Sequence, residues 1–167
     1  MKTTAFFNRI LTWLTGKKLT VDNSVVRELD LDRFLGSWYE VARFNHFFER
    51  GMEQTKANYV LRDDGNIDVI NTGIKNGKPK TAKGKAKLTD IPSLLRVSFF
   101  GPFYSDYRVM LLDADYRYML IGSGSDNYLW ILSRTPELTD SIRKSILDEA
   151  KERGYDIGKL IWVKQEP

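Results

Sequence analysis

Cysteine is absent from the 167 residues, and histidine occurs only once, as His46. Without thiols the chain can form no disulfide, no thiolate nucleophile and no thiolate metal site, and it offers no cysteine for a lipid anchor. A zinc site built from several histidines is also excluded, and we predict no metal and no cofactor. The fold must therefore be stabilised by burial of apolar side chains, for which one domain of this length suffices.

Long hydrophobic runs are also absent. No stretch reaches the roughly 20 apolar residues that cross a bilayer, and the first 18 residues contain no apolar run of a clear export signal. Phe6, Phe7, Ile10, Leu11 and Leu14 instead recur at helical spacing. We expect residues 1–24 to be a basic amphipathic segment, whose first 20 residues either bind a membrane surface or pack on the protein, followed by one domain over 25–167.

Negative charge is missing from the first twenty residues, which hold Lys2, Arg9, Lys17 and Lys18 and no acidic side chain. These four account for the whole net charge of +4, so the rest of the chain is neutral. Nucleic-acid binding depends largely on neutralising phosphates with a basic face. We therefore predict no nucleic-acid partner.

Short segments rich in Val, Ile, Tyr and Phe, separated by turn signals such as Asn76-Gly77, fill the middle of the chain. They predict eight strands, over residues 37–45, 54–62, 67–75, 78–89, 94–100, 106–113, 116–122 and 127–134. A helix is expected from the cap Thr139 to about Arg153, and residues 160–163 could add a last strand. The predicted class is all-β, an eight-stranded antiparallel up-and-down barrel with the helix packed outside.

The fourth segment separates its two faces most clearly. Lys83, Lys85 and Lys87 share one parity, whereas Ala82, Gly84 and Ala86 share the other. Three small inward residues favour a hollow interior. The alternative is a weak edge strand protected by its lysines.

The same alternation predicts which side chains face the interior and contact a ligand. These are Ala57, Tyr59, Val69, Asn71, Ala82, Ala86, Val97, Phe99, Tyr107, Val109, Met119, Ile121, Tyr128 and Trp130. The set is apolar and aromatic with few hydroxyl groups, which suits a small lipid such as one with an acyl chain.

Three short motifs in a fixed order carry a family resemblance. Gly36-Ser37-Trp38 opens the first strand, Asp113-Ala114-Asp115-Tyr116 lies between the sixth and seventh, and Arg134 ends the eighth. Together with longer stretches such as VSFFGPFY and YLWILSRTP, they resemble the lipocalin family over residues 25–166. The chain is most similar to its bacterial outer-membrane lipoprotein branch, with apolipoprotein D as an animal relative.

The resemblance implies binding, storage or transport of a fatty acid or lysophospholipid, in the service of membrane maintenance. It also implies the cell envelope, either outer membrane or periplasm, although such relatives are anchored through a lipidated cysteine that this sequence lacks. Cytoplasmic or peripheral membrane placement stays open, as does a homodimer. Trp38 is expected at the closed end of the barrel with Arg134 over its ring, and Gly36, Asp113, Asp115 and Tyr116 are expected in structural roles.

Catalysis is not predicted. His46 follows the first strand and is expected to be an exposed or locally bonded loop residue. Glu40 shares the parity of Trp38, but no second inward acid accompanies it for acid-base work. Two alternatives remain, a lipid-modifying enzyme of the isomerase type in the same cavity and a membrane-docked interaction module. Exposed aromatics around Gly101-Pro102 could contact lipid or a second subunit.

Overall fold

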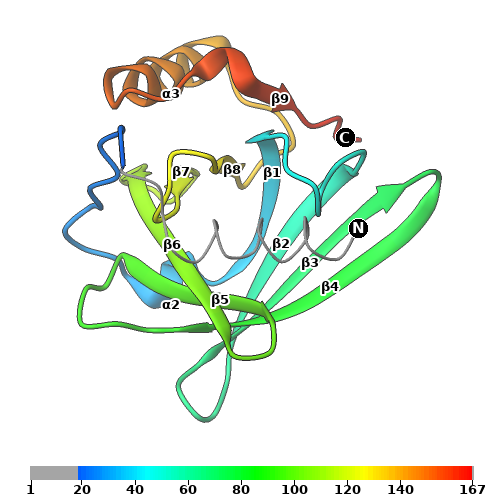
Figure 1. Cartoon of the computed structure of the whole chain (residues 1–167), viewed down its shortest axis with the longest axis vertical. Helices are drawn as coiled ribbons and strands as arrows, with labels where there is room; N and C mark the ends of the chain where they lie inside the picture. Colours follow the sequence, from blue (N-terminus) through cyan, green and yellow to red (C-terminus); the bar gives the residue numbers. More distant parts are fainter. Residues whose placement is uncertain (1–18, 167) are drawn as a thin grey trace, which may run out of the picture.

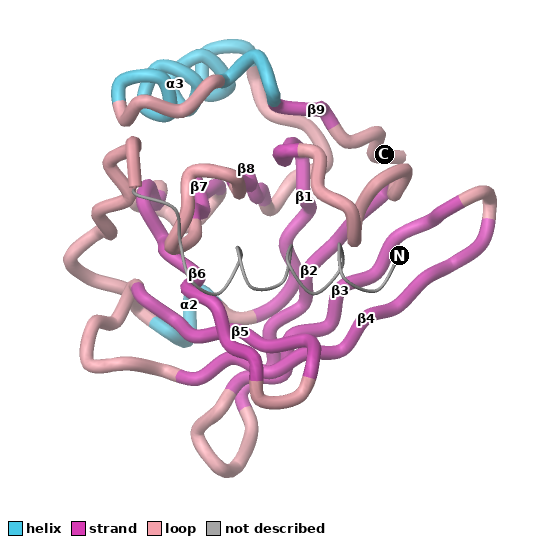
Figure 2. Tube along the Cα trace, in the orientation of Figure 1, coloured by secondary structure: helices cyan, strands magenta, loops and turns pink. Residues whose placement is uncertain are grey.

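The computed structural model describes residues 19–166 and shows a β-barrel with one long helix outside it (Figures 1 and 2). The amphipathic helix expected over residues 6–14 lies outside the described residues. The elements are α2 (Leu31–Phe34), β1 (Gly36–Phe44), β2 (Glu53–Leu61), β3 (Ile67–Lys75), β4 (Lys78–Lys87), β5 (Leu94–Phe100), β6 (Phe103–Leu112), β7 (Tyr118–Gly122), β8 (Leu129–Ser133), α3 (Asp140–Glu152), η1 (Ile157–Lys159) and β9 (Leu160–Trp162).

Each strand from β1 to β8 pairs antiparallel with the next, and β8 pairs back with β1. The sheet is therefore closed, as an up-and-down barrel requires. The predicted fold class is confirmed. Two strands begin at other residues than expected. β6 begins at Phe103 and not at residue 106. β7 begins at Tyr118 and not at residue 116, because residues 113–117 form a turn in which Tyr116 has a φ of 56°.

The C-terminal tail closes a gap between β1 and β2. These strands pair only over the first part of β1, and after a bulge near Glu40 the strand β1 pairs with β9 instead. The Gln165 side-chain amide donates to the carbonyl oxygens of Glu40 at 2.7 Å and Thr55 at 2.9 Å. These two bonds satisfy backbone groups that the separated strands would leave unpaired.

Helix α3 packs on the outer face of the barrel, over β1, β7 and β8 (Figure 1). Thr139 caps it by accepting a hydrogen bond from the Ile142 amide. Ile146 and Ala150 are buried against apolar side chains of the strands, and Val21 from the N-terminal side joins the same cluster. Val21, which precedes the predicted boundary at residue 25, therefore contacts the barrel, while the boundary itself stays a prediction.

The short helix α2 closes one end of the barrel. Trp38 is fully buried there and donates from Nε1 to the carbonyl of Phe34 at 2.8 Å. The Arg134 guanidinium lies 3.7 Å from the centre of the Trp38 ring. It also donates to four carbonyl oxygens around the end of α2, those of Arg33, Phe34, Leu35 and Ser37. Arg134 therefore satisfies carbonyls that have no partner within the helix.

The remaining signature residues surround this floor. Gly36 has a φ of 93° and comes within reach of Arg134, so a side chain there would be strained. Asp113 accepts from the backbone and side chain of Arg117, which holds its pKa below the usual range. The Tyr116 hydroxyl accepts from the Asp30 amide at 2.7 Å, whereas Asp115 is exposed.

Replacing Trp38 by alanine tests this arrangement. Trp38→Ala removes a fully buried ring and the stacking partner of Arg134. We expect the free energy of unfolding to fall by about 3 to 5 kcal/mol, as for other truncations of large buried aromatics. Chemical denaturation measures it, with the exposed Val60→Ala as the control. An unchanged denaturation midpoint in Trp38→Ala would contradict the role given to this residue.

Candidate functional site

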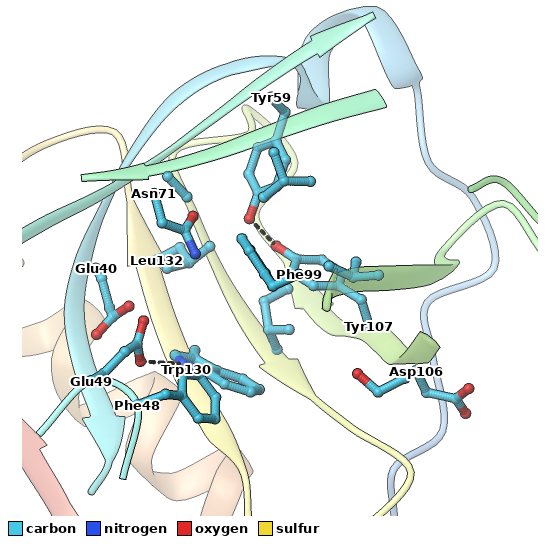
Figure 3. Close-up of a pocket in the computed structure, with 15 residues that line it drawn as sticks. Glu40, Phe48, Glu49, Tyr59, Asn71, Phe99, Asp106, Tyr107, Trp130 and Leu132 are labelled. Carbon is cyan, nitrogen blue, oxygen red and sulfur yellow. Dashed lines mark hydrogen bonds between the residues drawn. The ribbon is translucent and has the colours of Figure 1, made fainter. Parts of the chain in front are cut away.

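A cavity of about 90 Å³ lies inside the barrel, between Tyr59, which packs on Phe34 of α2, and Glu49 in the loop after β1 (Figure 3). The loop between β1 and β2 and the strands β1, β2, β3, β5, β6, β7 and β8 contribute its lining. The lining residues are Glu40, Phe48, Glu49, Ala57, Tyr59, Val69, Asn71, Val97, Phe99, Ser105, Asp106, Tyr107, Ile121, Trp130 and Leu132. An enclosed space of about 150 Å³ holds one benzene ring. The cavity therefore accepts a whole acyl chain only if lining side chains move or the chain extends out of the mouth.

Nine of the side chains predicted to face a ligand line this cavity. They are Ala57, Tyr59, Val69, Asn71, Val97, Phe99, Tyr107, Ile121 and Trp130. Ala86, Val109 and Met119 are buried in the barrel core without reaching the cavity, and Tyr128 stacks on Trp130 with ring centres 5.8 Å apart. Contact of any of these residues with a ligand stays a prediction.

Ala82 lies on the same face of the sheet as its partner Asn71 but does not reach the cavity, because its part of β4 extends beyond β5. Within the described chain β4 pairs with β5 only over residues 85–87, and the β3–β4 hairpin projects past the other strands (Figure 1). Ala82 is consequently exposed. The space over Gly84 is not hollow either: a Cβ atom there would lie 2.7 Å from the Phe99 ring. Gly84 therefore makes room for the Phe99 ring.

The deep end of the cavity is uncharged. The hydroxyl groups of Tyr59 and Tyr107 are hydrogen-bonded at 2.8 Å, and the Phe34 ring packs on Tyr59 with 4.8 Å between ring centres. Burial raises the pKa of both tyrosines, so they are neutral at physiological pH. Apolar walls with one satisfied hydroxyl pair suit the tip of a hydrocarbon chain.

The mouth of the cavity carries a buried charged cluster. Glu40 and Glu49 line the cavity and face each other, with the rings of Phe48 and Trp130 beside them (Figure 3). We call these four residues the acidic corner. Trp130 donates from Nε1 to Glu49 Oε2 at 3.2 Å, which fixes the position of that carboxyl group.

Arg43 lies behind the acidic corner, with its side chain only 1% exposed. It donates to Glu40 Oε1 at 2.8 Å and to the backbone carbonyls of Glu49 and Met52 at 2.7 and 3.0 Å. These carbonyls belong to the β1–β2 loop, residues 45–52. Arg43 therefore holds this loop in place, and its charge is engaged inside the wall of the barrel.

The two buried carboxyl groups raise or lower each other's pKa. Burial raises the pKa of Glu40 to about 8, the neighbouring Glu49 carboxylate adds to this, and Arg43 opposes it. Burial raises the pKa of Glu49 as well, whereas Arg43 and hydrogen bonds from Trp130 and Glu40 lower it. Near neutral pH Glu40 is therefore protonated.

His46 is buried, so the expectation of an exposed loop histidine is wrong. Its ring packs on Phe48 at 3.9 Å between ring centres and contacts Trp130 at 5.5 Å. Its Nε2 lies 2.8 Å from Glu49 Oε2, but neither ring nitrogen has a hydrogen-bond partner of good geometry. Burial lowers the pKa of His46 to about 4, which keeps the ring neutral.

Glu49 is the second acid that sequence alternation does not reveal. It lies in the β1–β2 loop, where the period of two that orders a strand no longer applies. Phe48 is missed for the same reason.

In residues 19–166 no group of three or more histidine, cysteine or acidic side chains could hold a metal ion, and no helix there is long and apolar enough to cross a membrane.

A closed antiparallel barrel around a mostly apolar cavity defines the class of small-ligand-binding barrel proteins. The model of the lipocalin-like domain matches residues 29–165. The chain belongs to the lipocalin family, whose members are generally proteins that bind small hydrophobic ligands.

Individual relatives agree with this assignment. The chain is 48% identical to the outer membrane lipoprotein Blc of Escherichia coli strain K12, over 85% of this chain and 82% of the relative. It is 32% identical to apolipoprotein D of Mus musculus, over 84% and 79%. The crystal structure of lobster apocrustacyanin A1 superposes with a TM-score of 0.70 at 21% identity, over 91% of this chain and 90% of that one.

The acidic corner predicts an unusual dependence of stability on pH. Glu40 stays protonated in the folded state up to about pH 8, whereas an unfolded glutamate ionises near 4.5. The folded state thus binds more protons, and the free energy of unfolding should fall as pH rises. Between pH 6.5 and pH 8 His46 is neutral in the folded state. In the unfolded state its ordinary pKa of 6.5 leaves it half protonated at pH 6.5 and almost fully neutral at pH 8, so it offsets only a small part of the slope.

We expect the free energy of unfolding to fall by about 1 to 2 kcal/mol over that pH range. Glu40→Gln should remove at least half of the slope, while Glu53→Gln, an exposed change of the same kind, should keep it. Urea denaturation at pH 6.5, 7.25 and 8 gives the values. Equal slopes in the wild type and Glu40→Gln would refute the assignment of the proton to Glu40.

Proposed function

We propose that the protein binds a lipid with a single acyl chain, a fatty acid or lysophospholipid, in the barrel cavity. The observation that carries this proposal is the gradient along the cavity, from neutral apolar walls around Tyr59 to charged groups at Glu49. Such a gradient fits a molecule with a hydrocarbon tail and a polar head. Each buried methylene contributes about 0.8 kcal/mol, so even part of a chain gives useful affinity.

Storage or transport of that lipid in the cell envelope, for membrane maintenance, is the role we propose. The outer membrane lipoproteins that the chain resembles support the envelope, outer membrane or periplasm, as the place. Phe100 and Phe103 are 59% and 44% exposed on the β5–β6 hairpin. Contact of this hairpin with a membrane or with a second subunit would place the mouth where lipid is exchanged.

One observation favours a second candidate function. Glu40 and Glu49 are a pair of carboxyl groups in the cavity with raised pKa values, which suits proton transfer to a bound lipid. An isomerase would use this pair. The arrangement also fits head-group recognition, and the class to which the chain belongs favours binding without catalysis.

Filling the cavity tests the proposed function. Ala57→Phe places a ring in the lining, whereas Val60→Phe adds the same ring at an exposed position of β2. We expect native mass spectrometry and lipid extraction to recover about one lipid per chain from the wild type and Val60→Phe, and none from Ala57→Phe. Overpacking should cost Ala57→Phe only about 1 to 3 kcal/mol, so a folded sample remains available.

Titration with a fatty acid or lysophospholipid should change the fluorescence of Trp130 in the wild type, and much less in Ala57→Phe. Lipid bound equally well by Ala57→Phe would place the site outside the cavity. Recovery of a chemically altered lipid after incubation, abolished in Glu49→Gln, would favour the isomerase.

A further inference from the structure

We propose that the acidic corner selects lipids whose head carries a positive charge, a primary or quaternary ammonium group, over lipids with an anionic head. This inference rests on the proposed function and specifies the head group at the same site. It follows from the charge of the cavity lining, from the engagement of the nearby cations, and from the two aromatic rings beside the carboxyl groups.

The charged side chains in the lining are all acidic: Glu40, Glu49 and Asp106. Asp106 is already paired, since Arg96 and Arg108 both donate to it. Glu40 and Glu49 together have one buried cation, Arg43, and its guanidinium is not part of the lining. An anionic head at the mouth would therefore meet carboxyl groups without a free cation to pair with.

Arg43 cannot turn to such a head without losing its present bonds. Its two terminal nitrogens donate to Glu40 and to two carbonyls of the β1–β2 loop, and its Nε lies 3.9 Å from Glu49 Oε2. Moving the guanidinium would leave these buried carbonyls unpaired and release the loop, which is unfavourable. The arginine thus supports the acidic corner and does not offer an anion site.

Aromatic faces beside carboxylates are the chemistry that recognises ammonium groups. Phe48 and Trp130 line the cavity on the same side as the two glutamates (Figure 3). Phe48 is 40% exposed, so these rings and carboxyl groups lie at the mouth of the cavity. A lipid that enters with its hydrocarbon chain first would leave its head group there. An ammonium head would also replace the proton on Glu40, because a nearby positive charge favours the carboxylate.

That replacement gives binding a characteristic dependence on pH. The groups that face Glu40 and Glu49 are Arg43 from β1, the neutral His46 from the loop, and the Trp130 indole from β8. A cation lowers the pKa of the pair and releases a proton, so its affinity should rise from pH 6 toward the pKa of Glu40, about 8. The affinity of an anion should fall over the same range.

The test uses three amphiphiles with the same twelve-carbon chain, added below their micelle concentrations: dodecyltrimethylammonium, dodecanol and dodecanoate. Isothermal calorimetry on delipidated protein at neutral pH and 0.15 M salt gives the affinities. We expect the ammonium compound to bind the wild type at least about tenfold more tightly than dodecanoate. Glu49→Gln and Glu40→Gln should each lower this ratio severalfold.

Glu53→Gln, which removes the same charge from an exposed position at the start of β2, is the matched control and should keep the wild-type ratio. A second comparison, of lysophosphatidylcholine with lysophosphatidate of equal chain length, identifies the kind of ammonium ligand. Tighter binding of lysophosphatidylcholine indicates a phospholipid head. If these two bind equally and only dodecyltrimethylammonium is preferred over its anionic counterpart, the ligand is a simple amine; both results support the ammonium site.

Two outcomes overturn the inference by itself: dodecanoate bound as tightly as the ammonium compound, or a ratio unchanged in both Glu49→Gln and Glu40→Gln. Dodecanol would still bind in these cases, so the proposed function would stand. Failure of all three amphiphiles to bind would instead refute the proposed function, and the inference with it.

Discussion

The contact of Arg134 with Trp38 and the end of α2 is the constraint on which the rest of the structure depends. One guanidinium covers the ring at 3.7 Å and donates to four carbonyls that a short helix cannot satisfy itself. An arginine can do both because its donors lie in the plane of the group while its face stacks on the ring. The barrel is thereby closed at one end, and a ligand can enter only from the other.

The two ends of the cavity differ in polarity because regular secondary structure forms one end and a loop forms the other. Regular strands and α2 form the closed end, where Tyr59 and Tyr107 satisfy each other within apolar walls. An irregular loop forms the mouth, and Arg43 holds it through backbone carbonyls. This loop brings Glu49 opposite Glu40. The polar head of a lipid therefore contacts charged side chains only when its hydrocarbon chain is already inside the cavity.

The sequence predicts the fold and most of the cavity wall because a closed antiparallel sheet keeps a period of two. Nine inward residues follow from that alternation alone. The exposure of Ala82 does not follow from alternation, because parity tells which face a residue takes but not how far a neighbouring strand extends, and β5 ends before it. Glu49 and the burial of His46 could not be predicted, since a loop conformation depends on tertiary contacts such as those of Arg43.

A crystal structure of the protein with dodecyltrimethylammonium is the most direct measurement of the central claim, that lipids enter this cavity chain first and leave their head at the acidic corner. The account predicts that the dodecyl chain lies between Tyr59 and Trp130, with its terminal methyl group toward Phe34. The ammonium group is then in contact with Glu49 and the ring of Phe48. An empty cavity, a chain bound on the outer surface, or a head directed toward Tyr107 would contradict it.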